Sequence, residues 1–287
     1  MASVDPGTLV LVGTPLGNLG DAPPRLVHEL TTADVVAAED TRTLHRLLSG
    51  LGIRTLNPPL SYHEHNEVAR TADLLGRLQA GSRVVLVTDA GMPSISDPGY
   101  RLVQACANVG VTVTAVPGPS AVTVALVLSG LATQRFCFEG FLPRSGSART
   151  ALIAALVSEP RTIVFFESPH RLAKTLSDLA VALGPGRPAA VCRELTKLHE
   201  QVRRGTLTEL AQWAGPGVRG ECTVVVGGAP PTTPAAADPA AWVSAVAELE
   251  ATGITRRDAI AEVAVRQGAP RRAVYDVVHG VRTAQRA

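Results

Sequence analysis

The most informative stretch of the sequence is Thr88-Asp89-Ala90-Gly91-Met92-Pro93-Ser94-Ile95-Ser96-Asp97-Pro98-Gly99. It follows the apolar run 83–87, which predicts a β-strand, and precedes a predicted helix over residues 100–108. A strand that ends on small, turn-forming residues exposes backbone N–H and C=O groups at the edge of a sheet. In open α/β sheets this edge is where ligands bind.

A second junction repeats this design. Residues 111–116 predict a strand, and Pro117-Gly118-Pro119-Ser120-Ala121 leads into an apolar helix over 122–129. We expect Ser120 to cap that helix and leave its backbone available to a ligand. Two such junctions so close in sequence predict one shared small-molecule site. The glycines of loop 13–20 lack the G-x-G-x-x-G spacing of dinucleotide-binding loops, and the chain has no phosphate-binding P-loop motif.

Strand-like runs alternate with helical patterns through the first two-thirds of the chain, which indicates an α/β fold. The predicted organisation is two α/β lobes with a cofactor cleft between them, followed by a small helical domain. Its boundaries are 1–131 and 132–228 for the lobes, 229–240 for a Pro- and Ala-rich linker, and 241–287 for the helical domain.

The C-terminal domain has the outline of a helix-turn-helix. Its predicted helices are 242–250, 256–267 and 271–279, with the break at Gly268-Ala269-Pro270. Five arginines fall near the helix ends: Arg256, Arg257, Arg266, Arg271 and Arg272. The pattern fits either a solvated helical cap or a surface that contacts nucleic acid.

Composition excludes several classes of protein. The chain has 287 residues, and its 46% apolar content excludes wholesale disorder. No uncharged apolar run is long enough for a membrane span, and the N-terminus lacks a signal-peptide pattern, so we expect a cytoplasmic protein. The four cysteines form no CxxC pair, and His63-Glu64-His65 has no third ligand at useful spacing. We expect no metal site.

Charged clusters follow three of the predicted strands. They are Glu39-Asp40-Thr41-Arg42, Glu167-Ser168-Pro169-His170-Arg171 and Arg193-Glu194-Leu195-Thr196-Lys197. One such cluster is readily explained as a helix cap or a salt bridge. Three at strand ends that can converge favour a functional site.

These motifs, together with Phe138-Glu139-Gly140-Phe141-Leu142-Pro143 and in this order, resemble one family. The chain is similar to the bacterial small-subunit (16S) ribosomal RNA cytidine-2′-O-methyltransferases, a branch of the tetrapyrrole methylase superfamily. The resemblance covers roughly residues 8–280.

The resemblance implies S-adenosylmethionine as methyl donor, bound between the two lobes. It also implies a homodimer, and as target the 2′-hydroxyl of a cytidine in the decoding centre of the small ribosomal subunit. Carried over by position, the donor site comprises Leu16, Met92, Ile95, Ser120, Ala121, Phe166, Cys192, Glu221 and Cys222.

Methyl transfer to a ribose hydroxyl depends chiefly on alignment of the attacking oxygen. That hydroxyl must also lose its proton, to a carboxylate or an amine. The candidates are Glu39, Asp40, Glu139, Glu167, Glu194 and Lys197, of which we select Glu139 and Lys197. Arginine forks suit RNA phosphates, and the predicted contacts are Arg42, Arg144, Arg171 and Arg193.

Two alternatives remain open at this point. The first is a methyltransferase of the same fold that acts on a tetrapyrrole or corrin precursor. Relatives of that kind often carry Asp where Met92 stands, so the neutral residue favours RNA. The second is a non-catalytic RNA-binding assembly factor that uses the donor pocket as a structural ligand site.

Overall fold

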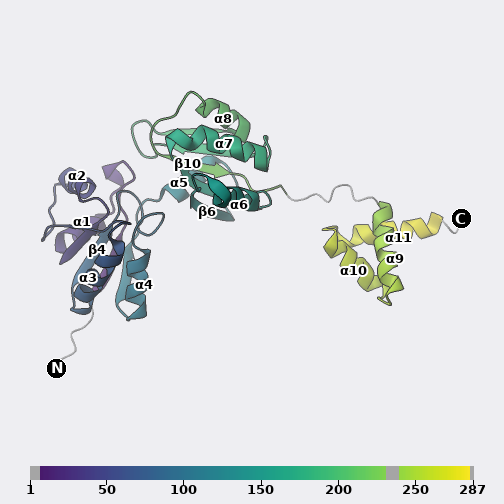
Figure 1. Ribbon diagram of the computed structural model, residues 1–287, viewed down its shortest axis with the longest axis horizontal. Helices are drawn as coiled ribbons and strands as arrows, with labels where there is room; N and C mark the ends of the chain where they lie inside the picture. Colours follow the sequence, from purple (N-terminus) through teal and green to yellow (C-terminus); the bar gives the residue numbers. More distant parts are fainter. Residues whose placement is uncertain (1–6, 231–238, 285–287) are drawn as a thin grey trace. The chain divides into compact units, whose positions relative to one another are not determined.

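The computed structural model describes residues 7–230 and 239–284. Internal contacts divide the chain into two compact units, residues 1–228 and 229–287. The first unit contains two β-sheets and the second is helical (Figure 1). No helix in the described part of the chain is long and apolar enough to cross a membrane.

The first sheet is parallel and has the strand order β3-β2-β4-β1-β5. Its strands are β1 (Thr8–Val12), β2 (Val35–Ala38), β3 (Leu60–Ser61), β4 (Arg83–Val87) and β5 (Thr112–Val116). Its helices are α1 (Pro24–Thr32), α2 (Thr41–Leu51), α3 (Glu67–Gln79) and α4 (Tyr100–Asn108), with a 3-10 turn η1 (Leu19–Asp21). The central strands read as continuous apolar runs because α1 and α2 pack on one face and α3 and α4 on the other.

The second sheet is mixed, in the order β6-β7-β10-β8-β9. Only β6 and β7 are parallel to each other, and the other pairs are antiparallel. Its strands are β6 (Phe136–Phe141), β7 (Thr162–Glu167), β8 (Pro188–Arg193), β9 (Gln201–Thr206) and β10 (Cys222–Val226). Helices α6 (Gly146–Leu156), α7 (Pro169–Leu183) and α8 (Leu207–Ala214) pack on one face.

Helix α5 (Ala121–Ser129) connects the two lobes. It starts at the exit of β5 in the first sheet and packs against the second sheet, on the face opposite α7 and α8 (Figure 1). Its sequence is apolar on nearly every side; Val122, Ala125 and Leu126 are buried, whereas Val127 is 74% exposed. The exits of β4 and β5 are thereby held beside the second sheet.

The structure confirms the predicted two-lobe α/β fold with C-terminal helices. The elements absent from the prediction are η1, β3, β9 and α8. Strand β9 is a polar edge strand without apolar alternation, so it carries little signal. Helix α8 did carry one, because Thr206 and Glu209 form a capping box. Most of the predicted linker 229–240 lies outside the described residues.

The C-terminal unit consists of α9 (Pro239–Ala251), α10 (Arg256–Arg266) and α11 (Arg271–Ala284). Its small core includes Val246, Ile260, Val263, Val274 and Val278. The predicted breaks at residues 251–255 and 268–270 correspond to breaks at 252–255 and 267–270 in the structure.

Candidate active site

Three strand exits of the first sheet are joined by backbone contacts. Beyond β1, the amide of Thr14 donates to Gly91 O (2.9 Å), and the amide of Gly91 donates to Thr14 O (3.1 Å). Gly13 and Gly118 pack backbone against backbone, so that a Cβ on Gly118 would lie 2.7 Å from the Cα of Gly13. Gly91 has φ +81°, a conformation that favours glycine. These glycines allow the exits of β1, β4 and β5 to interlock.

A cavity of about 390 Å³ opens beside these exits, between the two lobes. The first lobe contributes Leu16, Glu39, Asp89, Ala90, Gly91, Met92, Ile95, Ser96, Asp97, Ser120 and Ala121. The second contributes Phe141, Phe166, Glu167, Ser168, Pro169, Glu221, Cys222 and Thr223. The two junctions singled out in the sequence therefore line one cavity.

One wall of the cavity is aromatic. Phe166, at the end of β7, packs against Phe138 and Phe141 of β6, with ring centroids 5.0 Å and 5.5 Å apart. These rings give the cavity a rigid apolar surface on the second-lobe side.

The N-terminus of α5 borders the cavity at Ser120 and Ala121. Ser120 occupies the N-cap position, but its side chain makes no capping hydrogen bond. The prediction that the Ser120 hydroxyl caps this helix is therefore wrong. Since no side chain caps them, the first amides of α5 form the positive end of a helix dipole beside the cavity.

Acidic side chains also line the cavity and give part of it a negative charge. Burial, followed by the nearby charge of Glu39, raises the pKa of Asp97 to about 7. Burial also raises the pKa of Glu39, whose Oε2 accepts a hydrogen bond from the amide of Asp89 (3.2 Å). A carboxyl group that titrates near neutral pH is suited to accept a proton under physiological conditions.

The loop that carries Asp97 has an unusual backbone. Ser94 and Ser96 have φ values of 74° and 65°, in the left-handed region that residues other than glycine rarely adopt. Gly99 fits closely as well, because a Cβ there would lie 2.6 Å from Ser94 Oγ. Strained backbone of this kind concentrates at functional sites. Asp97 was not among the selected candidates. Its place in the loop 88–99, which follows a predicted strand at the expected ligand-binding edge, could have indicated it.

All but one of the residues predicted for the donor site line the cavity. They are Leu16, Met92, Ile95, Ser120, Ala121, Phe166, Glu221 and Cys222. The exception is Cys192, which is buried under α5 and donates a hydrogen bond from Sγ to Ala125 O (3.7 Å). Its cross-strand neighbour Thr223 lines the cavity instead.

The two residues selected for catalysis lie elsewhere. Glu139 does not line the cavity; alternation along β6 places Phe138 toward α5, and Cys137 packs on the other face of the sheet. Glu139 is on the side of Cys137, whose pKa is raised by burial first and in part by a hydrogen bond with Glu139. The structure therefore does not support Glu139 as a proton acceptor in this cavity.

Lys197 lines a neighbouring cavity of about 490 Å³, which shares Leu16, Glu39 and Asp89 with the first. Its Nζ lies 3.0 Å from carboxylate oxygens of both Glu194 and Glu221. Burial alone lowers the pKa of Lys197, but these two hydrogen bonds outweigh it and the net pKa is raised. Lys197 is therefore protonated at neutral pH, which suits a cation that positions groups rather than a proton acceptor.

Three of the four arginines predicted to bind phosphate are held by contacts within the chain. Arg42 pairs with the carboxylate that caps its own helix (2.7 Å). Arg171 and Arg193 donate to backbone oxygens, at 2.7 Å and 3.1 Å. Arg144 is exposed in the loop after β6, with no side-chain partner among the described residues. Among all the residues that the structure describes, no group of His, Cys, Asp and Glu side chains could hold a metal ion.

The raised pKa of Asp97 predicts a pH-dependent stability. The folded chain binds the Asp97 proton more tightly than the unfolded chain, so its contribution to stability is present at low pH and is lost as pH rises through about 7. We expect Asp97→Asn to raise the melting temperature relative to the original chain at pH 8, and by less at pH 5. Thermal unfolding at the two pH values checks this. Asp276→Asn, on exposed α11, is the control, and an equal difference at both pH values would contradict the assignment.

Comparison with known proteins extends these observations. Residues 8–211 match the family model of Tetrapyrrole (Corrin/Porphyrin) Methylases. Ribosomal RNA small subunit methyltransferase I of Mycobacterium tuberculosis (strain H37Rv) is 54% identical over 273 residues, covering 95% of this chain and 94% of the relative. The protein of the same name from Synechocystis is 46% identical, covering 94% and 97%.

Solved structures of lower identity share the fold. A cobalt precorrin-4 methyltransferase aligns with a TM-score of 0.60 at 20% identity, over 77% of this chain and 94% of its own. A uroporphyrin-III C-methyltransferase from Thermus thermophilus, complexed with S-adenosyl homocysteine, aligns with a TM-score of 0.56 at 20% identity, over 77% and 97%. Both alignments cover about the length of the two-lobe unit.

Proposed function

The chain belongs to the ribosomal RNA small subunit methyltransferase I family of the tetrapyrrole methylases, and from this premise we propose its reaction. It transfers a methyl group from S-adenosylmethionine to the 2′-hydroxyl of a cytidine in the decoding centre of 16S ribosomal RNA. The observation that carries this proposal is 54% identity over 95% of the chain, with a cavity at the strand exits. We also propose a homodimer in the cytoplasm, as the family resemblance implies.

The residues of the cavity fit this donor. When bound, S-adenosylmethionine supplies an electrophilic methyl group on a positively charged sulfur. The carboxylates of Glu39 and Asp89 place negative charge in the cavity, which complements a sulfonium cation. The uncapped N-terminus of α5 suits a carboxylate such as that of the donor's amino-acid part. The apolar wall at Phe166 provides a surface for the flat adenine ring of the donor.

Another cavity, of about 460 Å³ and distinct from the one lined by Lys197, adjoins the donor cavity and offers a route for the target nucleoside. The two cavities share Glu39, Ser96 and Asp97, while Tyr100 and Arg101 line only the 460 Å³ cavity. A ribose hydroxyl that enters through the 460 Å³ cavity passes Glu39 and Asp97 where the two cavities join. We therefore assign Asp97 as the proton acceptor, with Glu39 beside it.

Mass spectrometry of ribosomal nucleosides tests the proposed function. Small subunits that lack the modification are incubated with the full chain and S-adenosylmethionine, and their RNA is digested to nucleosides. We expect 2′-O-methylcytidine to appear only when both the chain and the donor are present. Methylation of a uroporphyrin substrate without any methylation of the RNA would contradict the proposal and favour the tetrapyrrole alternative.

A further inference from the structure

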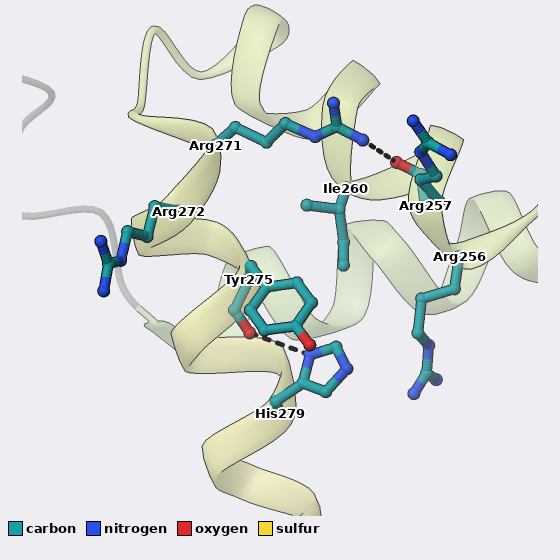
Figure 2. A pocket seen from close by; sticks show the side chains of 7 residues that line it. All are labelled: Arg256, Arg257, Ile260, Arg271, Arg272, Tyr275 and His279. Carbon is teal, nitrogen blue, oxygen red and sulfur yellow. Dashed lines mark hydrogen bonds between the residues drawn. The ribbon is translucent and has the colours of Figure 1, made fainter.

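A cavity of about 720 Å³ lies in the C-terminal unit, where the first turns of α10 and α11 meet (Figure 2). Its lining residues are Arg256, Arg257, Ile260, Arg271, Arg272, Tyr275 and His279. No carboxylate contributes to the lining.

The charges of this cavity oppose the stability of its own helices. Arg256 and Arg257 are the first two residues of α10, and Arg271 and Arg272 are the first two of α11. A helix N-terminus is positive, so cations there are unfavourable. The first turn of α11 contains no acidic residue to offset them. In α10, Asp258 in the first turn and the ion pair of Arg256 with Glu250 offset this charge. The repulsion therefore remains chiefly at Arg271 and Arg272 of α11, where it favours an anionic ligand.

The four arginines divide into two pairs by their contacts. Arg256 forms a two-pronged ion pair with Glu250 (both contacts 2.7 Å), and Arg271 donates to Arg257 O (3.2 Å). The side chains of Arg257 and Arg272 are exposed and have no hydrogen bond or ion pair with any described residue. The first pair shapes the cavity, and the second pair is available to a ligand.

An aromatic platform lies between these arginines. The rings of Tyr275 and His279 are stacked, with centroids 3.8 Å apart and an interplanar angle of 19°. The Nδ1 of His279 lies 3.0 Å from the backbone oxygen of Tyr275, which fixes the histidine ring (Figure 2). Tyr275 is 49% exposed although it is a large aromatic residue. An exposed aromatic ring next to arginine is a combination on which proteins hold unpaired bases.

We propose that this cavity binds an unpaired nucleotide of the small-subunit RNA, with its base on the Tyr275 ring and adjacent phosphates on Arg257 and Arg272. The inference rests on the proposed function, since it names a second contact of the same RNA substrate. The guanidinium groups surround Ile260 and Tyr275 instead of converging on one point, which suits successive phosphates of a chain (Figure 2). A-form RNA has a major groove too narrow for a recognition helix, so unpaired RNA is the better ligand for this helix pair.

RNA binding by the full chain tests the proposal. Affinity for deproteinised small-subunit RNA is measured by fluorescence anisotropy at several salt concentrations for Arg257→Ala, Arg272→Ala and Tyr275→Ala. Arg266→Ala removes the same charge from α10 outside the cavity and is the matched control. Replacing either Arg257 or Arg272 by Ala should reduce the magnitude of the slope of log K against log salt by about 0.7. Tyr275→Ala should weaken binding by about 5- to 150-fold, and Tyr275→Phe should bind as the original chain does.

The outcomes separate this inference from the proposed function. The cavity assignment is overturned if Arg257→Ala and Arg272→Ala have the same salt slope as Arg266→Ala and if Tyr275→Ala binds RNA as tightly as Arg266→Ala. This holds even if the original chain methylates the RNA. Loss of binding to assembled subunits with unchanged binding to bare RNA also overturns it, because a ribosomal protein would then be the ligand. Failure of the original chain to methylate small-subunit RNA refutes the proposed function instead.

Discussion

Gly118→Ala is expected to weaken binding of S-adenosylmethionine by about 5- to 150-fold. The new Cβ would lie 2.7 Å from the Cα of Gly13 and 2.8 Å from its carbonyl carbon, and both are backbone atoms that cannot rotate away. Overpacking of this kind costs about 1–3 kcal/mol. Because the exits of β1 and β5 must separate to relieve the contact, we expect the cost to appear in donor affinity.

Isothermal titration calorimetry with the donor and with S-adenosylhomocysteine measures this effect. Gly186→Ala is the matched control, since a Cβ there has no atom within 4 Å and Gly186 does not line the cavity. Melting temperatures of both variants show whether the chain remains folded. Equal affinity of Gly118→Ala and Gly186→Ala for the donor would contradict the claim that these interlocked exits shape its site.

Asp97→Asn is expected to lower kcat by about 10²- to 10⁴-fold, the range for loss of a general base. The amide retains the shape of the carboxylate, so the affinity for S-adenosylmethionine should stay nearly unchanged. Glu39→Gln should have the same direction of effect, because Glu39 lines both cavities beside Asp97. Single-turnover methylation of small subunits at saturating donor measures the rate.

The dependence of the methylation rate on pH provides a further test of Asp97. Asp97 accepts a proton only when it is ionised, and its pKa is about 7. The rate of the original chain should therefore rise with pH up to about 7 and then level off, and Asp97→Asn should lose this step. Glu139→Gln is the control, since Glu139 lies outside the cavity. If Glu139→Gln loses activity and Asp97→Asn retains it, the assignment of the proton acceptor is wrong.

Much of the fold could be predicted because its strongest signals are local. The central strands β1, β2 and β4 are buried on both faces, so each appears in the sequence as an apolar run that ends on turn-forming residues. Strand β9 is a polar edge strand, and its pairing with β8 depends on contacts between segments that the local pattern does not reveal.

The location of the candidate site was predictable because it follows the exits of two strands, whereas individual residues such as Met92 and Ser120 were carried over from the family resemblance. Glu139 was misplaced because strand alternation, which directs it away from α5, was not applied to β6. Lys197 is paired with Glu194 and with Glu221, which is distant in sequence, so its charge state follows only from tertiary structure. The same holds for Asp97, whose pKa depends on its burial and on Glu39.

A crystal structure of the full chain with S-adenosylhomocysteine would show where the methyl donor binds. We expect the ligand to lie in the cavity between the two lobes, in contact with Met92, Ala121 and Phe166. A ligand bound outside this cavity, in a preparation that methylates small-subunit RNA, would contradict it.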